Sequence, residues 1–247
     1  MSFLLSFRWI RLNAAAIAVK VVNLHKTYHV NGVLYPALRG VNLQVRRGEF
    51  LSIMGPSGSG KSTLLNLIGA LDRPTGGKVY IDGVDVFRLK DDGLAEFRNR
   101  KIGFIFQSYN LVMRTSVLRN VELPLTISRV SPKNRMVRSM EVLWRVGLGD
   151  KARRKPSELS GGEQQRVAIA RAVVNGPSII LGDEVTGNLD SKTGMEVISL
   201  LKSLNRDLNT TIILVTHDPM VAHATDRIVY LRDGVVQSEE VLRREAM

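Results

Sequence analysis

The sequence contains no cysteine among its 247 residues. That absence excludes disulfide bonds, zinc sites built on thiolates and cysteine nucleophiles, and it is typical of a reducing compartment such as the cytosol. No run of 18 or more apolar residues occurs, so we expect no membrane-spanning helix and assign any membrane role to a partner. No segment of 20 to 50 residues repeats, which argues against a solenoid or a duplicated domain.

Acidic residues are few relative to basic ones, and the formal net charge is +12. Such a balance suits attraction to nucleic acid, anionic lipid or nucleotide phosphates. The Lys and Arg residues are scattered, however, so we interpret most of them as solvated surface. Hydrophobic residues make up 44% of the chain, enough for the packed core of one large α/β domain or of a domain with an inserted lobe.

A glycine-rich stretch lies between an apolar run that ends at Met54 and a second apolar run that begins at Leu64. It fits the pattern G-x-x-x-x-G-K-[ST], and its flanks predict a strand before it and a helix after it. The inward N–H groups of such a loop bind phosphate oxygens, the lysine meets the β- and γ-phosphates, and the hydroxyl after it binds Mg²⁺. An ordinary helix-capping turn is the alternative, and the flanking strand and helix favour the first interpretation. The predicted phosphate-binding residues are Gly55, Pro56, Ser57, Gly58, Ser59, Gly60, Lys61, Ser62 and Thr63.

Polar side chains also follow three later apolar runs: Gln107, the pair Asp183 and Glu184, and His217. Because the carboxyl ends of parallel strands meet at the ligand crevice of an open sheet, we expect these residues to converge there. Asp183 would bind Mg²⁺ together with Ser62, either directly or through water. Glu184 would orient or deprotonate the attacking water, Gln107 would bridge water and metal, and His217 would donate to the γ-phosphate. A lone Gln or His is more often structural, so the adjacent carboxylates carry this prediction.

A second glycine-primed helix start occurs at Leu159–Glu163. Its serine and exposed amides predict another anion site, this time without a lysine. Between residues 108 and 156 the pattern becomes helical, and we place an inserted helical lobe there. Its clearest helix spans 135–146, where apolar side chains at three- and four-residue spacing are expected in the core: Met136, Met140, Leu143 and Trp144.

Three segments are expected along the chain. Residues 1–16 form an N-terminal extension, interpreted as a disordered tail, with a short amphipathic helix on lipid or on a partner as the alternative. Residues 17–238 form the nucleotide-binding domain, which starts with half-buried antiparallel strands. Residues 239–247 form a C-terminal tail.

Taken in order, these motifs resemble the ATP-binding subunits of ABC transporters over about residues 17–238. The run Gly187-Asn188-Leu189-Asp190 further resembles the branch that serves lipoprotein release and macrolide or peptide export. The resemblance implies an α/β P-loop NTPase core with a small antiparallel β subdomain and an inserted α-helical subdomain. It also implies ATP and Mg²⁺ as ligands and ATP hydrolysis coupled to transport.

The resemblance implies partners and further site residues as well. Two subunits, expected as a homodimer, would sandwich two ATPs, with Tyr28 stacked on adenine. A separate transmembrane permease would dock on the helical lobe, with Gln107 as a hinge. The expected location is therefore cytoplasmic and peripheral, on the inner face of the membrane, with no specific nucleic acid bound. The residues expected to face the nucleotide of the partner copy are Ser160, Gly161, Gly162 and Glu163.

Some positions depart from the pattern of that branch. Val185 stands where a proline is usual and Gly182 where an alanine is common. Valine does not fix φ, so we expect a looser turn at Glu184 and slower turnover. Met113 and Arg119 also replace a usual proline and glutamate, which alters the face expected to meet the permease. Two other functions stay open: a soluble ABC-type ATPase acting on nucleic acid or ribosomes, and a nucleotide-gated regulator that hydrolyses little.

Overall fold

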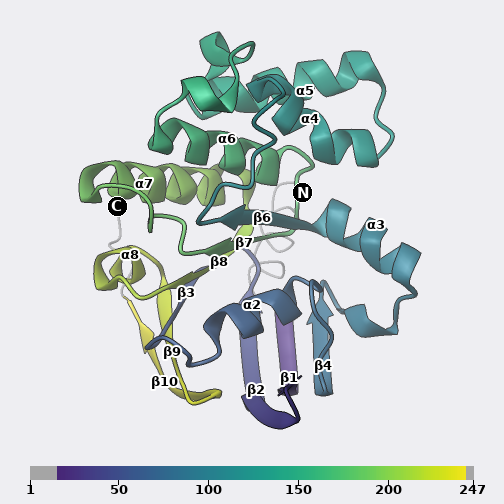
Figure 1. Ribbon diagram of the computed structural model, residues 1–247, viewed down its shortest axis with the longest axis vertical. Coiled ribbons are helices and arrows are strands. Elements are labelled where there is room, and N and C mark those ends of the chain that lie inside the picture. The colour runs from purple at the N-terminus through teal and green to yellow at the C-terminus, as the bar shows by residue number, and fades with distance from the viewer. Residues whose placement is uncertain (1–15, 243–247) are drawn as a thin grey trace, which may run out of the picture.

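The computed structural model describes residues 16–242. The expectations for residues 1–15 and 243–247 lie outside the described residues. Two sheets and a set of helices make up the described chain (Figure 1).

A six-stranded sheet lies at the centre in the order β10-β9-β3-β8-β7-β6 (Figure 1). Neighbouring strands run parallel except at the β9–β10 edge, which is antiparallel. Parallel strands are buried on both faces of a sheet, which is why β3, β6, β7 and β8 are continuous apolar runs in the sequence. The strands are β3 (Phe50–Met54), β6 (Ile102–Phe106), β7 (Ile179–Asp183), β8 (Thr211–Thr216), β9 (Arg227–Arg232) and β10 (Val235–Val241).

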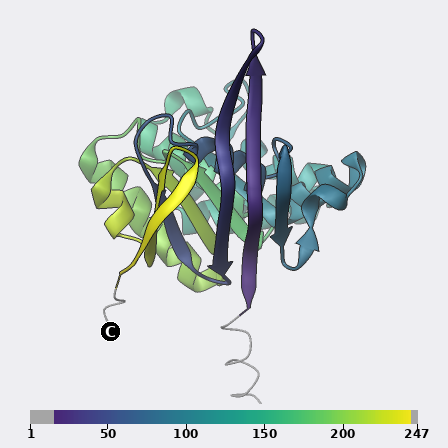
Figure 2. The ribbon, with the colours of Figure 1, turned by 90° about the horizontal axis from the view of Figure 1, so that it is seen from below.

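A smaller antiparallel sheet has the order β2-β1-β4-β5, and Figure 2 shows its long β1–β2 hairpin from below. Asn31 and Gly32 form the hairpin turn with φ of 50° and 79°, as a two-residue turn between twisted strands requires. The strands are β1 (Ile17–Val30), β2 (Val33–Arg46), β4 (Gly76–Ile81) and β5 (Val84–Asp85).

The helices divide the apolar core into two clusters. One cluster lies around α2 between the two sheets, and the other joins the opposite face of the large sheet to α4, α5, α6 and α7. The helices are α2 (Lys61–Ile68), α3 (Asp91–Lys101), α4 (Val117–Ile127), α5 (Pro132–Arg145), α6 (Gly161–Val173), α7 (Ser191–Leu208) and α8 (Pro219–His223), with 3-10 turns η1 (Val86–Arg88), η2 (Gly149–Lys151) and η3 (Pro156–Glu158).

The core assignment on α5 is wrong for two of its four side chains. Leu143 is fully buried and Met140 half-buried, but Met136 is 50% exposed and Trp144 is 63% exposed. The apolar spacing correctly indicates a helix. It does not show how much of the apolar stripe the neighbouring helices cover.

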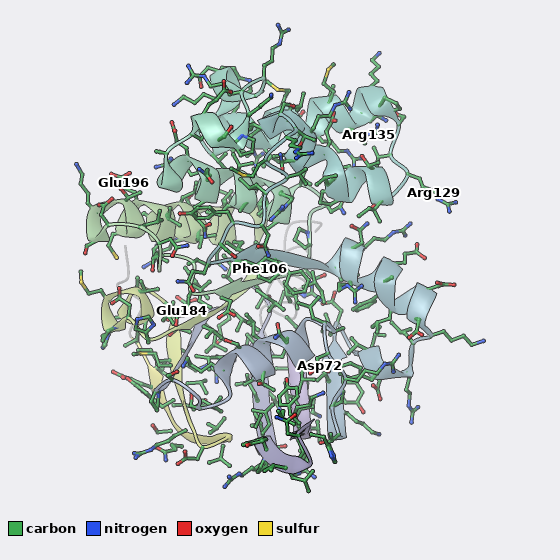
Figure 3. The ribbon with its side chains drawn as sticks, viewed as in Figure 1. Asp72, Phe106, Arg129, Arg135, Glu184 and Glu196 are labelled. Atoms are coloured by element: carbon green, nitrogen blue, oxygen red, sulfur yellow. The ribbon has the colours of Figure 1, made fainter. Side chains whose placement is uncertain are left out.

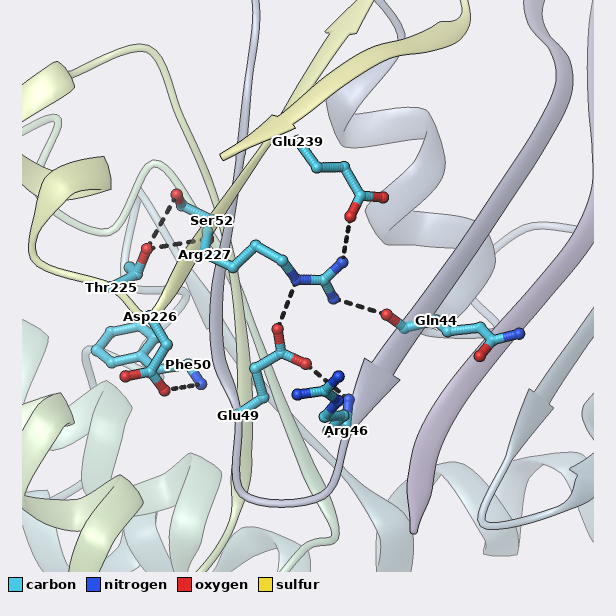
Figure 4. A network of polar contacts seen from close by, with 9 residues as sticks. All are labelled: Gln44, Arg46, Glu49, Phe50, Ser52, Thr225, Asp226, Arg227 and Glu239. Carbon is cyan, nitrogen blue, oxygen red and sulfur yellow. Dashed lines mark hydrogen bonds and ion pairs between the residues drawn. The ribbon is translucent and has the colours of Figure 1, made fainter. Parts of the chain in front are cut away.

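The chain remains in β10 through Val241, so Glu239 belongs to a strand and not to the expected tail. Its carboxylate accepts from Arg227 Nη1 at 2.6 Å. The same guanidinium donates to Glu49 Oε1 at 2.7 Å and to the carbonyl of Gln44 at 2.6 Å, as Figure 4 shows. Arg227 therefore joins the end of the small sheet to the edge of the large one, and this pairing holds the last strand in place.

Asp82, in the turn after β4, is the centre of a second network. Its carboxylate contacts Arg47, Lys101 Nζ at 3.1 Å and Ser178 Oγ at 2.6 Å. Burial disfavours the charged form, but the hydrogen bond from Ser178 and the interactions with Lys101 and Arg47 outweigh it and hold the pKa of Asp82 below its ordinary value.

This lowered pKa predicts an acid-sensitive contribution to stability. The contribution is complete above the ordinary carboxyl pKa of about 4 and is lost as the pH falls from there through the lower folded pKa. We expect Asp82→Asn to lower the free energy of unfolding at pH 7 by about 1–3 kcal/mol, with a smaller effect at pH 3, measured by urea denaturation. Asp233→Asn is the control, because Asp233 has the same left-handed φ before a glycine but is 78% exposed. An equal loss in both variants would contradict the role of the network.

Candidate active site

The loop from Gly55 to Gly60 joins β3 to α2 and is held by close backbone contacts. A Cβ on Gly55 would lie 2.0 Å from the carbonyl oxygen of Leu231, and one on Gly60 would lie 2.5 Å from that of Ala37. Gly60 also has φ of +100° at the N-cap of α2, a conformation that favours glycine. The glycines of the pattern are therefore needed for space, and at Gly60 for conformation as well.

Lys61, the first residue of α2, lies beneath this loop and is only 8% exposed. Its Nζ donates to the carbonyls of Gly55 at 2.8 Å and Pro56 at 2.9 Å. These bonds direct a buried positive charge to the inside of the loop, where phosphate oxygens are expected.

A cavity of about 580 Å³ opens beside the loop. It brings together the ends of β3, β7 and β8, as the order of parallel strands predicts. Ala37 from β2 also lines it, and no signal in the sequence connects that residue to the loop. The lining residues are Ala37, Ser57, Gly58, Gly60, Lys61, Ser62, Thr63, Glu184 and His217.

Ser62 lines the cavity, and its Oγ donates to Asp183 Oδ1 at 3.2 Å, although Asp183 itself is not a lining residue. Burial raises the pKa of Asp183 and the adjacent charge of Glu184 raises it further, whereas the bond from Ser62 and the charge of Lys61 act in the opposite direction. A cation here would favour the ionised carboxylate. A hydroxyl and a carboxylate are hard oxygen donors of the kind Mg²⁺ takes, so these residues fit that ion.

Glu184 and His217 form a second pair, with His217 Nδ1 donating to Glu184 Oε1 at 2.8 Å. The glutamate is 19% exposed and the histidine 73% exposed. The bond uses Nδ1 and leaves Nε2 as the ring nitrogen for another partner. Figure 3 labels Glu184, which lies in the turn just after β7 of the central sheet.

Gln107 lies one strand farther along, immediately after β6, and is turned toward the chain after β7. Its Nε2 donates to Asn188 Oδ1 at 3.3 Å, and Asn188 Nδ2 donates to the Gln107 carbonyl at 2.9 Å. Gln107 is not among the residues that line the cavity. The structure thus groups it with the Gly187 to Asp190 run, a contact that the sequence analysis does not foresee.

Tyr28, at the end of β1, is also outside the cavity lining and belongs to a small polar cluster. Its hydroxyl donates to Asp72 Oδ2 at 3.0 Å, and Lys26 Nζ lies 4.8 Å from the ring centroid. Lys26 also donates to Asp72 Oδ1 at 2.7 Å. Sequence reasoning missed Asp72 and Lys26, because no motif contains them. Together they fix the Tyr28 ring and cover one of its faces with a cation.

Ser160 is the N-cap of α6 and does not line the cavity. Its hydroxyl accepts from Glu163 N at 3.4 Å, and Glu163 Oε2 accepts from Ser160 N at 2.8 Å, so the two form a capping box. Lys151 pairs with Glu163, and this hydrogen bond, together with the one from Ser160 N, holds the pKa of that carboxyl below its ordinary value. A Cβ on Gly162 would lie 2.4 Å from Thr193 Cγ2, so α7 packs directly on this turn. None of residues 160–163 lines the cavity.

The cavity beside the glycine loop therefore forms a cradle for phosphates, and the second helix N-terminus, at Ser160, lies outside that cavity. The cradle supplies main-chain amides, a buried lysine, an oxygen pair suited to a divalent ion and a carboxylate–imidazole pair. This set fits a nucleoside triphosphate with Mg²⁺ and can position a water for phosphoryl transfer.

Comparison with known proteins gives a consistent result. A family model described as ABC transporter matches residues 38–187. The ABC transporter ATP-binding protein MJ0796 of Methanocaldococcus jannaschii is 52% identical over 229 residues, which cover 91% of this chain and 97% of that protein. A solved structure described as a dimeric MJ0796 cassette superposes with a TM-score of 0.84 at 51% identity and covers 92% of this chain and 99% of that one.

Two further relatives carry functional names. The lipoprotein-releasing system ATP-binding protein LolD of Syntrophus aciditrophicus is 47% identical, over 88% of this chain and 98% of that protein. The macrolide export ATP-binding/permease protein MacB of Syntrophobacter fumaroxidans is 50% identical, over 90% of this chain but only 31% of that protein.

The two left-handed glycines of the loop allow a matched test of the cradle. Gly58 and Gly60 both have positive φ, but a Cβ on Gly58 meets nothing within 4 Å. We expect Gly58→Ala to lower the free energy of unfolding by about 1–2 kcal/mol through conformation alone. Gly60→Ala should lower it by about 1–3 kcal/mol more because of the overlap with Ala37, as measured by urea denaturation without nucleotide. Equal losses would show that the loop is not compressed against β2.

Proposed function

The chain belongs to the family of ABC transporter ATP-binding subunits, and on this premise we propose that two copies of it hydrolyse ATP between them to drive a separate membrane subunit. The observation that carries the proposal is the separation of its two phosphate-binding segments. The P-loop cavity contains no residue from 160–163, although that segment has the capped helix start of an anion site. A second copy is the partner that would complete the site.

Nucleotide binding within one copy rests on the loop and the first turn of α2. The main-chain amides of residues 55–63 would surround the β- and γ-phosphates, and Lys61 would add a buried positive charge. Ser62 and Asp183 would hold Mg²⁺, which supplies positive charge beside the phosphate oxygens when it is bound. Tyr28 would stack on adenine through the ring face that Lys26 leaves uncovered.

The carboxylate of Glu184 would orient the attacking water behind the γ-phosphate and accept its proton. His217 supports this role through its 2.8 Å bond to Glu184 Oε1. Glu184 Oε2 accepts only a long bond from Thr216 Oγ1, at 3.5 Å, so this oxygen would accept from the attacking water. Gln107, held by Asn188, would respond to the γ-phosphate from the side of the helical lobe. Ser160 and Gly162 would reach the γ-phosphate of the partner copy.

The helical lobe is the proposed docking face for the permease. Leu123 and Ile127 on α4 are 39% and 68% exposed, and Met136 and Trp144 on α5 are exposed as well. Exposed apolar side chains gathered on one lobe are typical of interaction sites. Among the helices of residues 16–242, none combines the length and the hydropathy that a membrane-spanning segment needs. The proposed position is peripheral, on the cytoplasmic face, through contact with the permease. The names of the LolD and MacB relatives support export or lipoprotein handling as the process.

Substitution of Glu184 tests the catalytic role. We expect Glu184→Gln to lower the rate of ATP hydrolysis by roughly 10²–10⁴-fold, because the general base is lost, while ATP binding remains. The variant should accumulate as a dimer with ATP and Mg²⁺ in light scattering. Glu196→Gln is the control, since Glu196 is an exposed glutamate on α7, well away from Glu184 in Figure 3. Turnover of Glu184→Gln at the parent rate would disprove the role, and a strictly monomeric variant would disprove the shared site.

Substitution of Lys61 tests binding. Lys61→Ala should weaken ATP affinity by roughly 10- to 100-fold, which corresponds to the loss of one hydrogen bond to a charged group. Equilibrium binding of a fluorescent ATP analogue measures the change. Unchanged affinity would contradict the placement of phosphate beside this side chain.

Asp72 offers a test of the adenine contact. Asp72→Ala removes the acceptor that holds the Tyr28 hydroxyl, so we expect the KM for ATP to rise about threefold to tenfold, in line with a hydrogen bond of about 1 kcal/mol, with kcat unchanged. Asp91→Ala is the matched control, because Asp91 is 91% exposed and, within residues 16–242, pairs only with the exposed Arg73. A fall in kcat without a change in KM would contradict the role of Tyr28.

A further inference from the structure

The turn after β7 holds Glu184 in an unusual backbone conformation. Its φ is +47°, in the left-handed region that disfavours residues with a side chain. The turn is fixed by two main-chain bonds, from Glu184 N to the Val215 carbonyl and from Gly187 N to the Glu184 carbonyl, both 3.0 Å long. A strained residue at a reaction site requires surroundings that hold it in place.

Val185 supplies part of those surroundings through its side chain. Val185 is 3% exposed and packs on the Cα of Gly182, which precedes Glu184 by two residues. A Cβ on Gly182 would lie 2.7 Å from Val185 Cγ1 and 2.5 Å from Leu214 Cδ2. The φ of Gly182 is not in the left-handed region, so this glycine is needed for space and not for its conformation.

The main chain of Val185 is held separately by α6. Gln165 is fully buried, and its Nε2 donates to the Val185 carbonyl at 2.8 Å. Its Oε1 has no hydrogen-bond partner among the described residues. The bond therefore ties the Glu184 turn to the helix whose N-terminus is Ser160.

We propose that Val185 is a positioning residue for Glu184, seated by the missing side chain of Gly182 and anchored by Gln165. The packed valine side chain restrains the turn, as the ring of a proline would at the same position. The valine fits there because Gly182 has no side chain. The two departures from the family pattern are thus one coupled feature. This inference rests on the proposed function, because it takes Glu184 to orient the attacking water, and it predicts control of kcat without control of ATP affinity.

A double-mutant cycle tests the coupling. Gly182→Ala should lower kcat for ATP hydrolysis by roughly 10- to 100-fold, because the new Cβ displaces Val185 and the Glu184 turn with it. The KM for ATP should stay within about twofold, since the P-loop is untouched. Val185→Ala in the Gly182→Ala background removes Cγ1, leaves only the flexible end of Leu214 to adjust, and should restore kcat at least fivefold over Gly182→Ala alone.

Gly93→Ala is the matched control, since a Cβ at Gly93 meets nothing within 4 Å and its φ is not left-handed. It should turn over like the parent. Gln165→Met is the second variant, because it removes the donor to Val185 at similar volume together with an acceptor that has no partner. It should lower kcat while the urea midpoint and the KM for ATP stay near the parent values. If Gly182→Ala does not fold, Gln165→Met alone tests the positioning role.

Two results would overturn the inference: parent-like kcat in Gly182→Ala or Gln165→Met, or a double variant no faster than Gly182→Ala. Glu184→Gln is measured in the same assay, so that failure of the positioning role of Val185 can be distinguished from failure of the catalytic role of Glu184. If Glu184→Gln is inactive but the Gly182→Ala and Val185→Ala substitutions show no coupling in kcat, the positioning role alone is refuted. An active Glu184→Gln refutes the catalytic role as well.

Discussion

The nucleotide loop depends on backbone contacts so close that two of its residues have no room for a side chain. Gly55 lies against the Leu231 carbonyl of β9, and Gly60 lies against the Ala37 carbonyl of β2. The Ser59 carbonyl also accepts from Gly234 N at 3.1 Å. These contacts hold the loop in a compact turn, and successive main-chain amides in such a turn can converge on phosphate oxygens. The same contacts join the two sheets, so the position of the small sheet and the shape of the site depend on one another.

The order of the parallel strands then determines which side chains meet the loop. Because β8 lies next to β3 and β7 lies next to β8, the residues after these strands approach the first turn of α2. Asp183 reaches Ser62, and His217 reaches Glu184. Gln107 follows β6, the edge strand beside β7, and its side chain contacts Asn188 and does not line the cavity. The glycine loop thus lies after β3, near the centre of the sheet, and the helical lobe begins after β6, at its edge.

Periodicity predicted elements more reliably than it predicted exposure. The helix that contains Met136 and Trp144 is present, but both side chains are exposed. Helical spacing shows that residues share a face, and only the neighbouring helices decide how far that face is covered. The expectation of a looser turn at Glu184, where Val185 replaces a usual proline, also leaves out the packing of neighbouring side chains. A valine at 185 suggests a loose turn when only dihedral freedom is considered, but its burial against Gly182 and the bond from Gln165 hold it on two sides.

The sequence by itself determined the phosphate loop, the acidic end of β7, the cap of α6 and the family, because each depends on residues close together in the chain with a fixed local geometry. It also determined the alternation of apolar strands and helices that builds the central sheet. Only the tertiary structure decided that Ala37 lines the cavity, that Asp72 and Lys26 hold Tyr28, and that Gly182 makes room for Val185. These contacts join segments whose separation in the chain carries no signal, or depend on the space left by neighbouring side chains, and both arise only when the chain packs.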